Sequence, residues 1–440
     1  MKAQYLVGFF CMLVNISYAS EIKQSLYEHA TLKAMPLLVV VSPENDTELM
    51  SVAQILAKNL ERSGQFTVTL KATREPSKKS ELDGLFEKGY PLQIFLQHDD
   101  GRKSIGWRLY DVADQRLVKG KKCTKRGALA HGYADNLADD IWPVLTNQPS
   151  SFSSKLAYVK KKNVPGQKDR QRSQVCVANS DGSHEQLIIP QMGTYVSLYW
   201  HHDKNNPCIF CSEFTRYNVR FVSANFHGQK RTVLDLKGTC VGISLSNETN
   251  KAVYCRSGTI WEYVYDPVQM QAAHRVLIAN DGNNVSPTLL PSGDVIFCSD
   301  APSLLHSAKS KGPKIIKYSA RDKSTTLLTK DGYCVGPSYA KATGKIAYSK
   351  KLNGEMQLFV YDPANHTDVQ ITFDHGNKID CCWSPCGKYL VFCYRNGRIS
   401  RIAVMHVGLK KRYYITQAHE YCTSPAWSPV YDEVPSIITR

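Results

Sequence analysis

The sequence predicts an α+β domain, a mixed sheet with two helices, followed by an all-β domain made of six repeats of four strands. In the first part, apolar β-branched runs alternate with an amphipathic helical pattern. In the second part, an aromatic residue recurs about every 44 residues, and a Trp-Ser-Pro turn occurs near residue 383 and again near residue 427. The chain has 440 residues, which is too long for one ordinary core, so we expect at least two domains.

The first 20 residues are a predicted signal peptide. Lys2 gives a positive start, and the apolar run Tyr5–Val14 is too short to span a bilayer. Ser17 and Ala19 supply the small residues of a signal-peptidase site. We therefore expect a secreted protein whose mature chain starts near residue 20 or 21.

Residues 21–147 are predicted to form a small α/β domain. Its first part, residues 21–34, is expected to be a polar, mobile arm. A buried strand is expected at residues 36–42. The capping-box pair Asn45 and Glu48 then opens a helix. The apolar residues of this helix fall on one face, Gly64 ends it, and residues 66–70 form the next strand.

The rest of this domain is read as strands at residues 92–96, 104–110 and 116–124, followed by a second helix. Apolar residues recur every four positions in that helix, at Leu129, Tyr133, Leu137 and Ile141. Pro143 is expected to end or kink it. His131 is interpreted as an ordinary helical histidine, since no nucleophile or metal-ligand spacing lies near it. The order β-α-β-(α)-β-β-β-α predicts one mixed sheet covered by helices.

Residues 148–440 contain the repeats. The stretch from Asp380 to Phe392 is read as a strand, a Ser-Pro-x-Gly turn and a second strand. The first-strand position recurs at Tyr199, Ser244, Leu289, Tyr339, Trp383 and Trp427, and the second-strand aromatic at Tyr158, Phe210, Tyr254, Phe297, Tyr348 and Phe392. Four short strands per repeat are typical of a propeller blade, so Trp383 is expected to be a packing residue.

The two ends of the repeat region are complementary. The region begins with a second strand at Tyr158 and ends after a first strand at Trp427. The C-terminal strand should therefore complete the blade that the first residues begin, giving six blades in a closed ring. Two insertions, residues 160–172 and 301–314, are expected to be solvated loops that carry much of the excess positive charge.

The fourteen cysteines are interpreted mainly as packing residues. Cys211, Cys255, Cys298 and Cys393 each directly follow a second-strand aromatic, as a small buried hydrophobe would. The C-x-x-C pair Cys208 and Cys211, with His201-His202-Asp203 nearby, resembles a metal motif. On a strand, however, side chains three residues apart point to opposite faces. Cys240, Cys334 and Cys422 lie just before first-strand positions, where a disulfide stays open as an alternative.

Several motifs resemble those of the TolB family. They are S-P-A-W-S-P (425–430), C-W-S-P-C-G-K-Y-L-V-F (382–392) and S-Y-A-K-A-T-G-K-I-A-Y-S (338–349). In the first half, the segments at residues 55–66, 130–135 and 152–159 are similar to the helix-to-strand segment and the domain junction of that family. One departure is Cys386, which replaces the acid of the usual W-S-P-D-G turn.

The resemblance implies a non-enzymatic, monomeric periplasmic scaffold of the Tol-Pal system that needs no cofactor or metal. It would bind the peptidoglycan-associated lipoprotein Pal over the channel mouth of the propeller, and TolA through the N-terminal arm. Pal would link it peripherally to the outer membrane, and it would support membrane invagination at division and envelope integrity. The expected docking residues precede or begin the inner strands: Gly193, Thr194, Gly238, Thr239, Asn284, Val285, Tyr333, Ile379, Asp380, His419 and Glu420.

The sequence also bears on two alternative functions. A propeller-containing serine peptidase would need a G-x-S-x-G elbow and about 200 further residues of hydrolase, and the sequence contains neither. The formal charge of +16 favours an anionic partner, such as an envelope polymer. Nucleic acid is a poor candidate, because no platform of alternating aromatic and basic residues is present.

Overall fold

The computed structural model describes residues 34–75, 79–99, 104–124, 130–164, 167–201, 207–246, 251–266 and 271–431. The predicted signal peptide, residues 21–33 of the predicted arm, Leu129 and the His202-Asp203 pair lie outside the described residues. Contacts divide the chain into two units, one up to Ser153 and one from Ser154 onward. The domain bounds drawn from the sequence stay a prediction.

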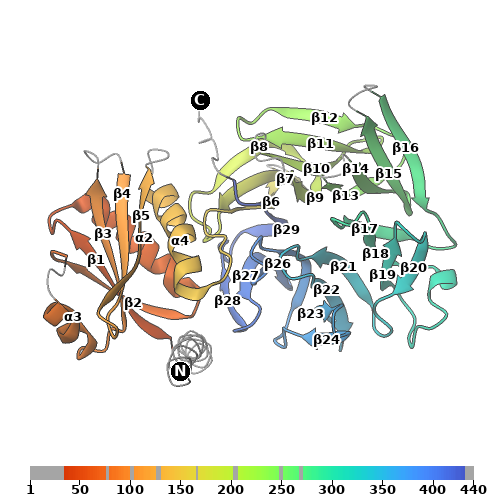
Figure 1. The fold of residues 1–440 in the computed structure, drawn as a ribbon. Coiled ribbons are helices and arrows are strands. Elements are labelled where there is room, and N and C mark those ends of the chain that lie inside the picture. The colour runs from red at the N-terminus through yellow and green to blue at the C-terminus, as the bar shows by residue number, and fades with distance from the viewer. Residues whose placement is uncertain are drawn as a thin grey trace, which may run out of the picture. The chain divides into compact units, whose positions relative to one another are not determined.

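The first unit contains a five-stranded mixed sheet in the order β2-β1-β3-β4-β5 (Figure 1). The strands are β1 (Met35–Ser42), β2 (Phe66–Ala72), β3 (Leu92–Asp99), β4 (Ser104–Asp111) and β5 (Arg116–Thr124). β1 pairs in parallel with β2 and β3, and the remaining pairs are antiparallel. This agrees with the mixed sheet predicted from the strand order.

Two long helices cover one face of this sheet. α2 (Thr47–Arg62) and α4 (Ala130–Thr146) share a core with the β1 side chains Leu37, Val39 and Val41. The opposite face carries Leu38 and Val40, with Leu85 packed against them from a third, short helix, α3 (Lys79–Phe86). The strand alternation thus buries both faces.

The start of α2 differs from the prediction. Its N-cap is Asp46, whose carboxylate accepts a 2.9 Å hydrogen bond from the Leu49 backbone N–H. Asn45, the expected cap, therefore lies one residue before the actual cap. Asp46 and Asn45 both suit a cap, so the sequence preference could not separate them. The C-terminal end of α2 agrees with the prediction that Gly64 ends the helix: α2 stops at Arg62, and Gly64 follows with φ +76°.

Pro143 was expected to end or kink α4; it does not end the helix, which continues to Thr146, and a kink stays a prediction. Proline removes the N–H that would have bonded the Asp139 carbonyl. The Ser150 hydroxyl donates a 3.2 Å hydrogen bond to that carbonyl instead. The Asp139 carboxylate also accepts hydrogen bonds from the backbone N–H groups of Phe152 (2.8 Å) and Ser153 (2.9 Å). Hydrogen bonds from residues 150–153 to Asp139 thus take the place of the backbone hydrogen bond that Pro143 cannot donate.

The second unit is a propeller of six blades, each with four strands. Four blades form separate sheets: β9–β12, β13–β16, β17–β20 and β21–β24. The other two blades, β25–β28 and β29 with β6–β8, meet in one eight-stranded sheet through a single parallel bridge between Ser400 and Tyr421. We call the first strand of each blade its inner strand. The prediction of six four-stranded blades is confirmed.

The bounds of the strands follow the repeat. The first three blades consist of β9 (Tyr195–Trp200), β10 (Cys208–Phe214), β11 (Val219–Asn225), β12 (Lys230–Leu234), β13 (Cys240–Ser246), β14 (Lys251–Arg256), β15 (Thr259–Asp266), β16 (Gln271–Ile278), β17 (Asn284–Leu289), β18 (Val295–Ser299), β19 (Lys314–Ser319) and β20 (Ser324–Leu327). The remaining three consist of β21 (Cys334–Tyr339), β22 (Ile346–Leu352), β23 (Glu355–Asp362), β24 (Thr367–Gln370), β25 (Asn377–Trp383), β26 (Tyr389–Asn396), β27 (Ile399–His406), β28 (Lys411–Tyr414), β29 (Tyr421–Trp427), β6 (Lys155–Val164), β7 (Gln167–Asn179) and β8 (Gln186–Gly193).

The ring is closed by the C-terminal strand, as predicted. β29 pairs antiparallel with β6, from Tyr421 opposite Lys161 to Trp427 opposite Leu156 (Figure 1). The Trp427 indole N–H donates a 2.7 Å hydrogen bond to the Ser154 hydroxyl. Strands from the two ends of the repeat region therefore share one blade.

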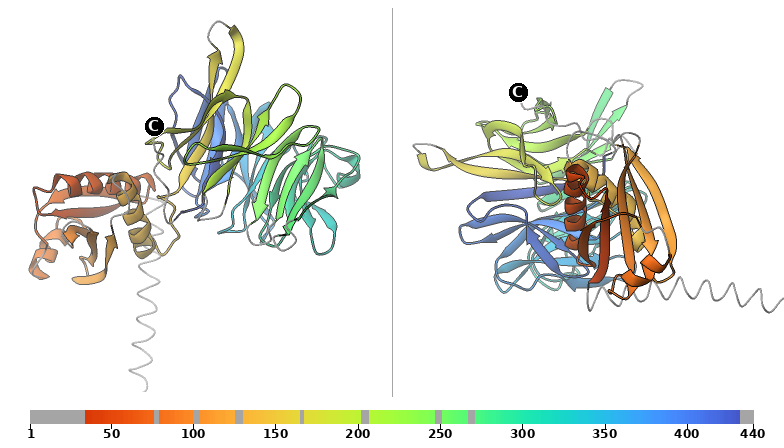
Figure 2. Two further views of the ribbon diagram at one scale, coloured as in Figure 1. Left: turned by 90° about the horizontal axis from the view of Figure 1, so that it is seen from above. Right: turned by 90° about the vertical axis from the view of Figure 1, so that its left-hand side faces the viewer.

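The insertion at residues 160–172 was expected to be a solvated loop, and this expectation is wrong. It extends β6 and β7 into a long hairpin, in which Lys162 pairs with Arg172. Figure 2 shows this yellow hairpin projecting beyond the other strands. The other insertion, residues 301–314, is irregular apart from one 3₁₀ turn at Pro302–Leu304.

The cysteines pack as predicted. Cys211, Cys255, Cys298 and Cys393 are buried thiols. Cys208 and Cys211 belong to different apolar clusters, as expected for side chains on opposite faces of β10. None of the described helices is long and apolar enough to cross a bilayer.

Candidate docking site where the inner strands begin

The inner strands of all six blades begin on the same side of the propeller, which we call the mouth side. The connections from each fourth strand to the next inner strand lie on this side, and so do the turns between second and third strands. Apart from Gly193, the last residue of the fourth strand β8, the docking residues predicted from the sequence belong to these connections or to the first four residues of an inner strand. Whether a partner contacts them stays a prediction.

Each inner strand contains one residue with a left-handed backbone, next to an irregularity in its pairing. These residues are Ser197, Gly242, Ser286, Gly336, Asp380 and Ser424, with φ between 50° and 62°. Glycine and short polar residues tolerate this conformation best. Asp380 is the one charged residue of the six. The pKa of its carboxyl is raised by desolvation, although the backbone N–H of Ser424 and the cations Arg395 and Lys161 oppose the shift.

Six of the predicted docking residues are exposed on the mouth side: Thr194, Gly238, Thr239, Tyr333, Asp380 and His419. Tyr333 keeps 47% of its surface accessible. Gly193 is partly buried, and a side chain there would collide with the Tyr195 ring. Tyr333 is therefore the largest exposed side chain among the predicted docking residues.

Other predicted residues serve the fold or a neighbouring residue. Asn284 is completely buried, and its amide nitrogen donates hydrogen bonds to the Gly258 carbonyl (3.1 Å) and the Asn280 side chain (2.9 Å). It is therefore poorly placed for direct contact, and Val285 beside it is half-buried. Glu420 is half-buried and pairs with the Lys160 ammonium at 2.5 Å.

The Lys160 ammonium links two carboxylates at the closing blade. It lies 2.5 Å from Glu420 and 2.8 Å from Glu185. Burial raises the pKa of Glu420, but hydrogen bonds from Lys160 and from the Gln417 backbone outweigh it, so the net shift is downward. Burial likewise opposes the charged form of Lys160, yet the two carboxylates raise its pKa. Glu420 is consequently a structural partner of Lys160.

Sequence reasoning missed three exposed aromatic residues on the mouth side, Phe214, Tyr217 and Phe373. Phe214 ends β10, and Tyr217 lies in the turn between β10 and β11 with 88% of its surface accessible. The branched residue Ile399, at the start of β27, is also exposed. A possible signal was the F-T-R-Y-N stretch at residues 214–218, where aromatic residues occupy a turn that other repeats fill with small or polar ones.

A pocket of about 340 Å³ opens on the mouth side between two blades. Met356 of β23 lines it on one blade, and Asn377, Ile379, Arg395 and Gly397 line it on the next. Of these five, only Ile379 was predicted from the sequence. Arg395 could have been found from the repeat, since it stands three residues after the second-strand aromatic Phe392.

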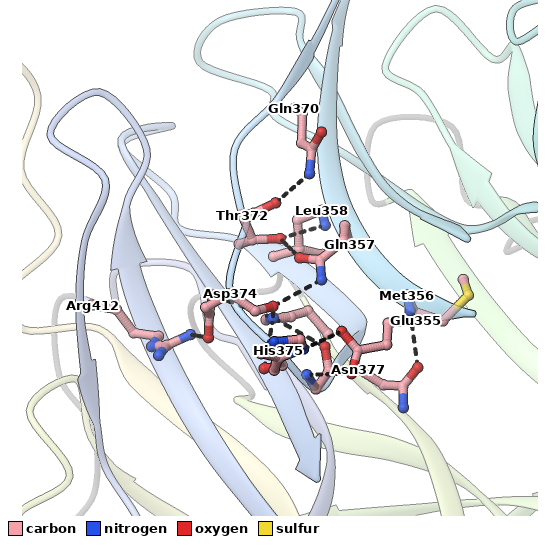
Figure 3. A network of polar contacts seen from close by, with 12 residues as sticks. Glu355, Met356, Gln357, Leu358, Gln370, Thr372, Asp374, His375, Asn377 and Arg412 are labelled. Atoms are coloured by element: carbon pink, nitrogen blue, oxygen red, sulfur yellow. Dashed lines mark hydrogen bonds and ion pairs between the residues drawn. The ribbon is translucent and has the colours of Figure 1, made fainter. Parts of the chain in front are cut away.

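A network of polar contacts holds the connection at residues 374–377 beside this pocket (Figure 3). The Gln357 amide donates to the Asp374 carbonyl (2.9 Å), and the Gln357 oxygen accepts from the Thr372 hydroxyl (2.7 Å). The Met356 N–H donates to the Asn377 side-chain oxygen at 2.9 Å. The wall of the pocket is therefore fixed by hydrogen bonds from the adjacent blade.

Two cations share one aromatic ring next to the pocket. The Lys161 ammonium lies 5.3 Å and the Arg395 guanidinium 5.9 Å from the centre of the Tyr421 ring. Such contacts stabilise the cations only modestly at an exposed site. No carboxylate within the described ranges forms an ion pair with either cation. This part of the mouth side therefore carries two cations that are not held in ion pairs, with the Asp380 carboxyl near both.

The structure defines the class of protein as an α+β unit followed by a closed six-bladed propeller. Comparisons with known proteins identify its family. The family model of the TolB beta propeller domain matches residues 142–430, which is more than half of the chain. The chain belongs to the TolB family, and this is a non-enzymatic family.

Individual relatives agree with this assignment. The Tol-Pal system protein TolB of Aromatoleum aromaticum is 27% identical over 206 residues, which are 44% of this chain and 46% of that protein. The protein of the same name from Albidiferax ferrireducens is 25% identical over 239 residues, 53% of each chain. The match thus spans about half the length of these curated relatives.

The fold is similar to a solved structure of the family. The crystal structure of TolB from Acinetobacter baumannii superposes with a TM-score of 0.74 at 20% sequence identity. The match covers 90% of this chain and 97% of that one. At this identity the comparison supports the α+β unit followed by a propeller, and it leaves partner contacts open.

Proposed function

We propose that the protein is a periplasmic scaffold of the Tol-Pal system that docks a Pal-like lipoprotein on the mouth side of its propeller. Through this lipoprotein it would associate with the outer membrane and support invagination at division and envelope integrity. The observation that carries the proposal is the position of exposed aromatic side chains. Phe214, Tyr217 and Tyr333 all lie in mouth-side connections or at their edge.

Exposed aromatic residues favour a protein partner over a small molecule. Tyrosine and phenylalanine are enriched in protein interfaces, where they bury large areas with few rotatable bonds. The exposed apolar residues of the outer strands are instead isolated aliphatic side chains, such as Val233 and Val276. A fourth exposed aromatic residue, Phe373, lies between β24 and β25 beneath the Lys410 ammonium, 4.9 Å from its ring centre.

Capture from envelope extract tests the docking side. The mature protein is immobilised, and a retained lipoprotein with a peptidoglycan-binding domain is identified by mass spectrometry. Tyr333→Glu is expected to reduce its recovery at least tenfold, because a charge would be buried without a partner in the interface. Val276→Glu is the matched control, since Val276 is 49% exposed on the outer strand β16. Equal recovery with both variants would move the docking site away from the mouth side.

We infer a second contact from the family resemblance, between the N-terminal arm and a TolA-like protein. Residues 21–33 lie outside the described structure, so only the sequence supports this contact. Removal of residues 21–33 from the mature chain is expected to abolish capture of the TolA-like protein and to leave capture of the lipoprotein unchanged. Retention of both proteins by the shortened chain would refute the role of the arm.

A further inference from the structure

The pocket between β23 and β25 combines apolar walls with hydrogen-bond donors. Met356 and Ile379 supply the apolar surface, while Arg395 and Asn377 supply polar groups. Because the Asn377 oxygen accepts from the Met356 N–H, the Asn377 amide nitrogen remains available as a donor (Figure 3). A volume of about 340 Å³ is at the small end of ligand pockets and suits a side chain with its flanking backbone.

The pocket is preorganised. The Gly376 N–H donates to the Glu355 carboxylate at 2.9 Å, and the Lys378 ammonium donates to the Gly376 carbonyl at 3.0 Å. Gly376 has φ +93°, and a side chain there would collide with the Tyr394 ring at 2.8 Å. The backbone beside the pocket is thus fixed before any ligand arrives, which lowers the entropy cost of binding.

The charged residues around the pocket determine which sign of charge a ligand can carry. Arg395 is exposed, lines the pocket and shares the Tyr421 ring with Lys161. The Asp380 carboxyl interacts electrostatically with both cations and offsets part of their charge, but no ion pair joins it to either cation among the described residues. The β6–β7 hairpin, to which Lys161 belongs, also carries the exposed basic residues Lys162 and Arg172. An anionic group is therefore favoured, and an incoming cation is repelled.

We propose that this pocket, which we call the Arg395 pocket, receives an acidic side chain of the protein that docks on the mouth side. The planar guanidinium would hold the carboxylate through two parallel hydrogen bonds, with Asn377 as an additional donor. The methylene groups of the acidic residue would lie against Met356 and Ile379. This inference rests on the proposed docking of a lipoprotein and adds the chemistry that its contact must contain.

Binding of the soluble, non-lipidated domain of the chain's own Pal-like lipoprotein tests the pocket. Isothermal titration compares the mature wild-type chain with Arg395→Gln, Arg395→Lys and Arg321→Gln. Arg321 is an exposed arginine in the turn between β19 and β20, at the strand ends opposite the mouth side. Arg395→Gln is expected to weaken binding about 10- to 100-fold. Arg395→Lys should weaken binding by a smaller factor, because lysine keeps the charge but cannot donate two parallel hydrogen bonds to one carboxylate. Arg321→Gln should bind like wild type.

The salt dependence provides a second readout in the same experiment. The wild-type affinity should fall between 50 and 300 mM NaCl, and the affinity of Arg395→Gln should fall less. If Arg395→Gln binds like wild type while Tyr333→Glu loses binding, the Arg395 pocket is unused although mouth-side docking stands. If Tyr333→Glu also binds like wild type, the proposed docking side itself fails.

A probe that does not depend on the lipoprotein completes the test. The Arg395 Nε–Hε resonance of the ¹⁵N-labelled mature protein is assigned by its loss in Arg395→Lys. Addition of the peptide Ac-Gly-Leu-Glu-Glu-Leu-Gly-amide is expected to shift this resonance, and the analogue with glutamine in place of both glutamates should not. A resonance that stays in place with the acidic peptide at millimolar concentration would overturn the Arg395 pocket, whichever protein docks on the mouth side.

Discussion

Buried ammonium groups fix two connections on the mouth side. Lys314 and Lys378 are completely buried, and each points back into the turn that precedes it. The Lys314 ammonium donates to the carbonyls of Ser310 (2.9 Å) and Gly312 (2.7 Å), and Lys378 does the same with His375 (3.1 Å) and Gly376 (3.0 Å). Desolvation lowers the pKa of both lysines. Each charge is held by backbone carbonyls that would otherwise lack a partner in the protein.

These lysines could not be predicted from the sequence. A lysine near a Gly-containing turn is usually solvated, and the charge of +16 suggested basic loops in water. The side chain folds inward only because the turn presents several carbonyls to one point. That arrangement depends on the backbone of the turn, which residue types alone do not specify.

Removal of the Lys378 charge should destabilise the propeller. In Lys378→Met the carbonyls of His375 and Gly376 lose this donor and the Asp374 carboxylate loses an ion pair, and we expect the free energy of unfolding to fall by about 2–4 kcal/mol. Lys323→Met is the control, since Lys323 is exposed in the turn between β19 and β20. Urea denaturation followed by tryptophan fluorescence measures both. Equal midpoints for the two variants would show that Lys378 does not stabilise the turn.

His406 should make the protein sensitive to acid. It is buried beside the Tyr389 ring, and its Nδ1 accepts a 3.0 Å hydrogen bond from the Leu409 N–H. Desolvation, together with the nearby Lys388 charge, lowers its pKa from 6.5 to about 4. The unfolded chain therefore binds the proton first, and stability is lost as the pH falls from about 6.5 to about 4, by about 3 kcal/mol in total.

Thermal unfolding of wild type and His406→Gln between pH 7 and pH 4.5 measures this effect. The variant should lose less stability over this range, because glutamine has no proton to gain, although its stability at pH 7 can be lower. Identical slopes for the two proteins would assign the acid sensitivity to other groups, such as Glu420, whose lowered pKa acts in the same direction at lower pH.

At the scale of elements, the closing strand decides whether the ring holds together. β29 is anchored at its end by Trp427 and by two bonds with Lys155: Ser428 N–H to the Lys155 carbonyl (2.8 Å) and Lys155 N–H to the Ser428 hydroxyl (2.7 Å). Without β29, strand β6 would present an unpaired edge. The blade shared by both ends of the repeat region is therefore the position most sensitive to truncation.

Replacement of the anchoring tryptophan tests this role. Trp427→Ala is expected to lower the free energy of unfolding by about 3–5 kcal/mol, because it leaves a cavity and removes the partner of Ser154. Tyr217→Ala, at an exposed turn position, should change it by less than about 0.5 kcal/mol. Denaturant midpoints give both values, and a Trp427→Ala midpoint equal to wild type would contradict the account of closure.

The sequence predicted the repeated strands of the propeller and the main strands and helices of the first unit, and it missed the β6–β7 hairpin. Aromatic spacing identified every inner and second strand, since periodicity adds weak signals over six copies. A further repeat was overlooked. Thr329, Thr372 and Thr416 each follow a fourth strand and accept a backbone N–H from a third strand at 2.8–2.9 Å. The β6–β7 hairpin is rich in charged residues that resemble a solvated loop, and the continuation of α4 through Pro143 depends on the fold of residues 150–153, so the sequence pattern predicted neither.

At the scale of the whole propeller, the mouth side combines accessible aromatic residues with unpaired positive charge. Of the predicted docking residues, Tyr333, Thr194 and His419 are accessible there, whereas Asn284 is buried. The topology could be predicted because the order of strands fixes where the inner strands begin. The accessibility of the side chains could not be predicted, since it depends on how each connection folds back on its blade. Phe214, Tyr217 and Arg395 were missed for this reason.

Hydrogen exchange tests mouth-side docking most directly. Amide exchange of the mature chain is measured by mass spectrometry with and without the soluble domain of its Pal-like lipoprotein. The account predicts that protection increases in the mouth-side connections, at residues 214–218, 328–333 and 371–380, and stays unchanged in the turns at the opposite ends of the strands, such as 320–323 and 407–410. Protection confined to those opposite turns, with the mouth-side connections unchanged, would contradict it.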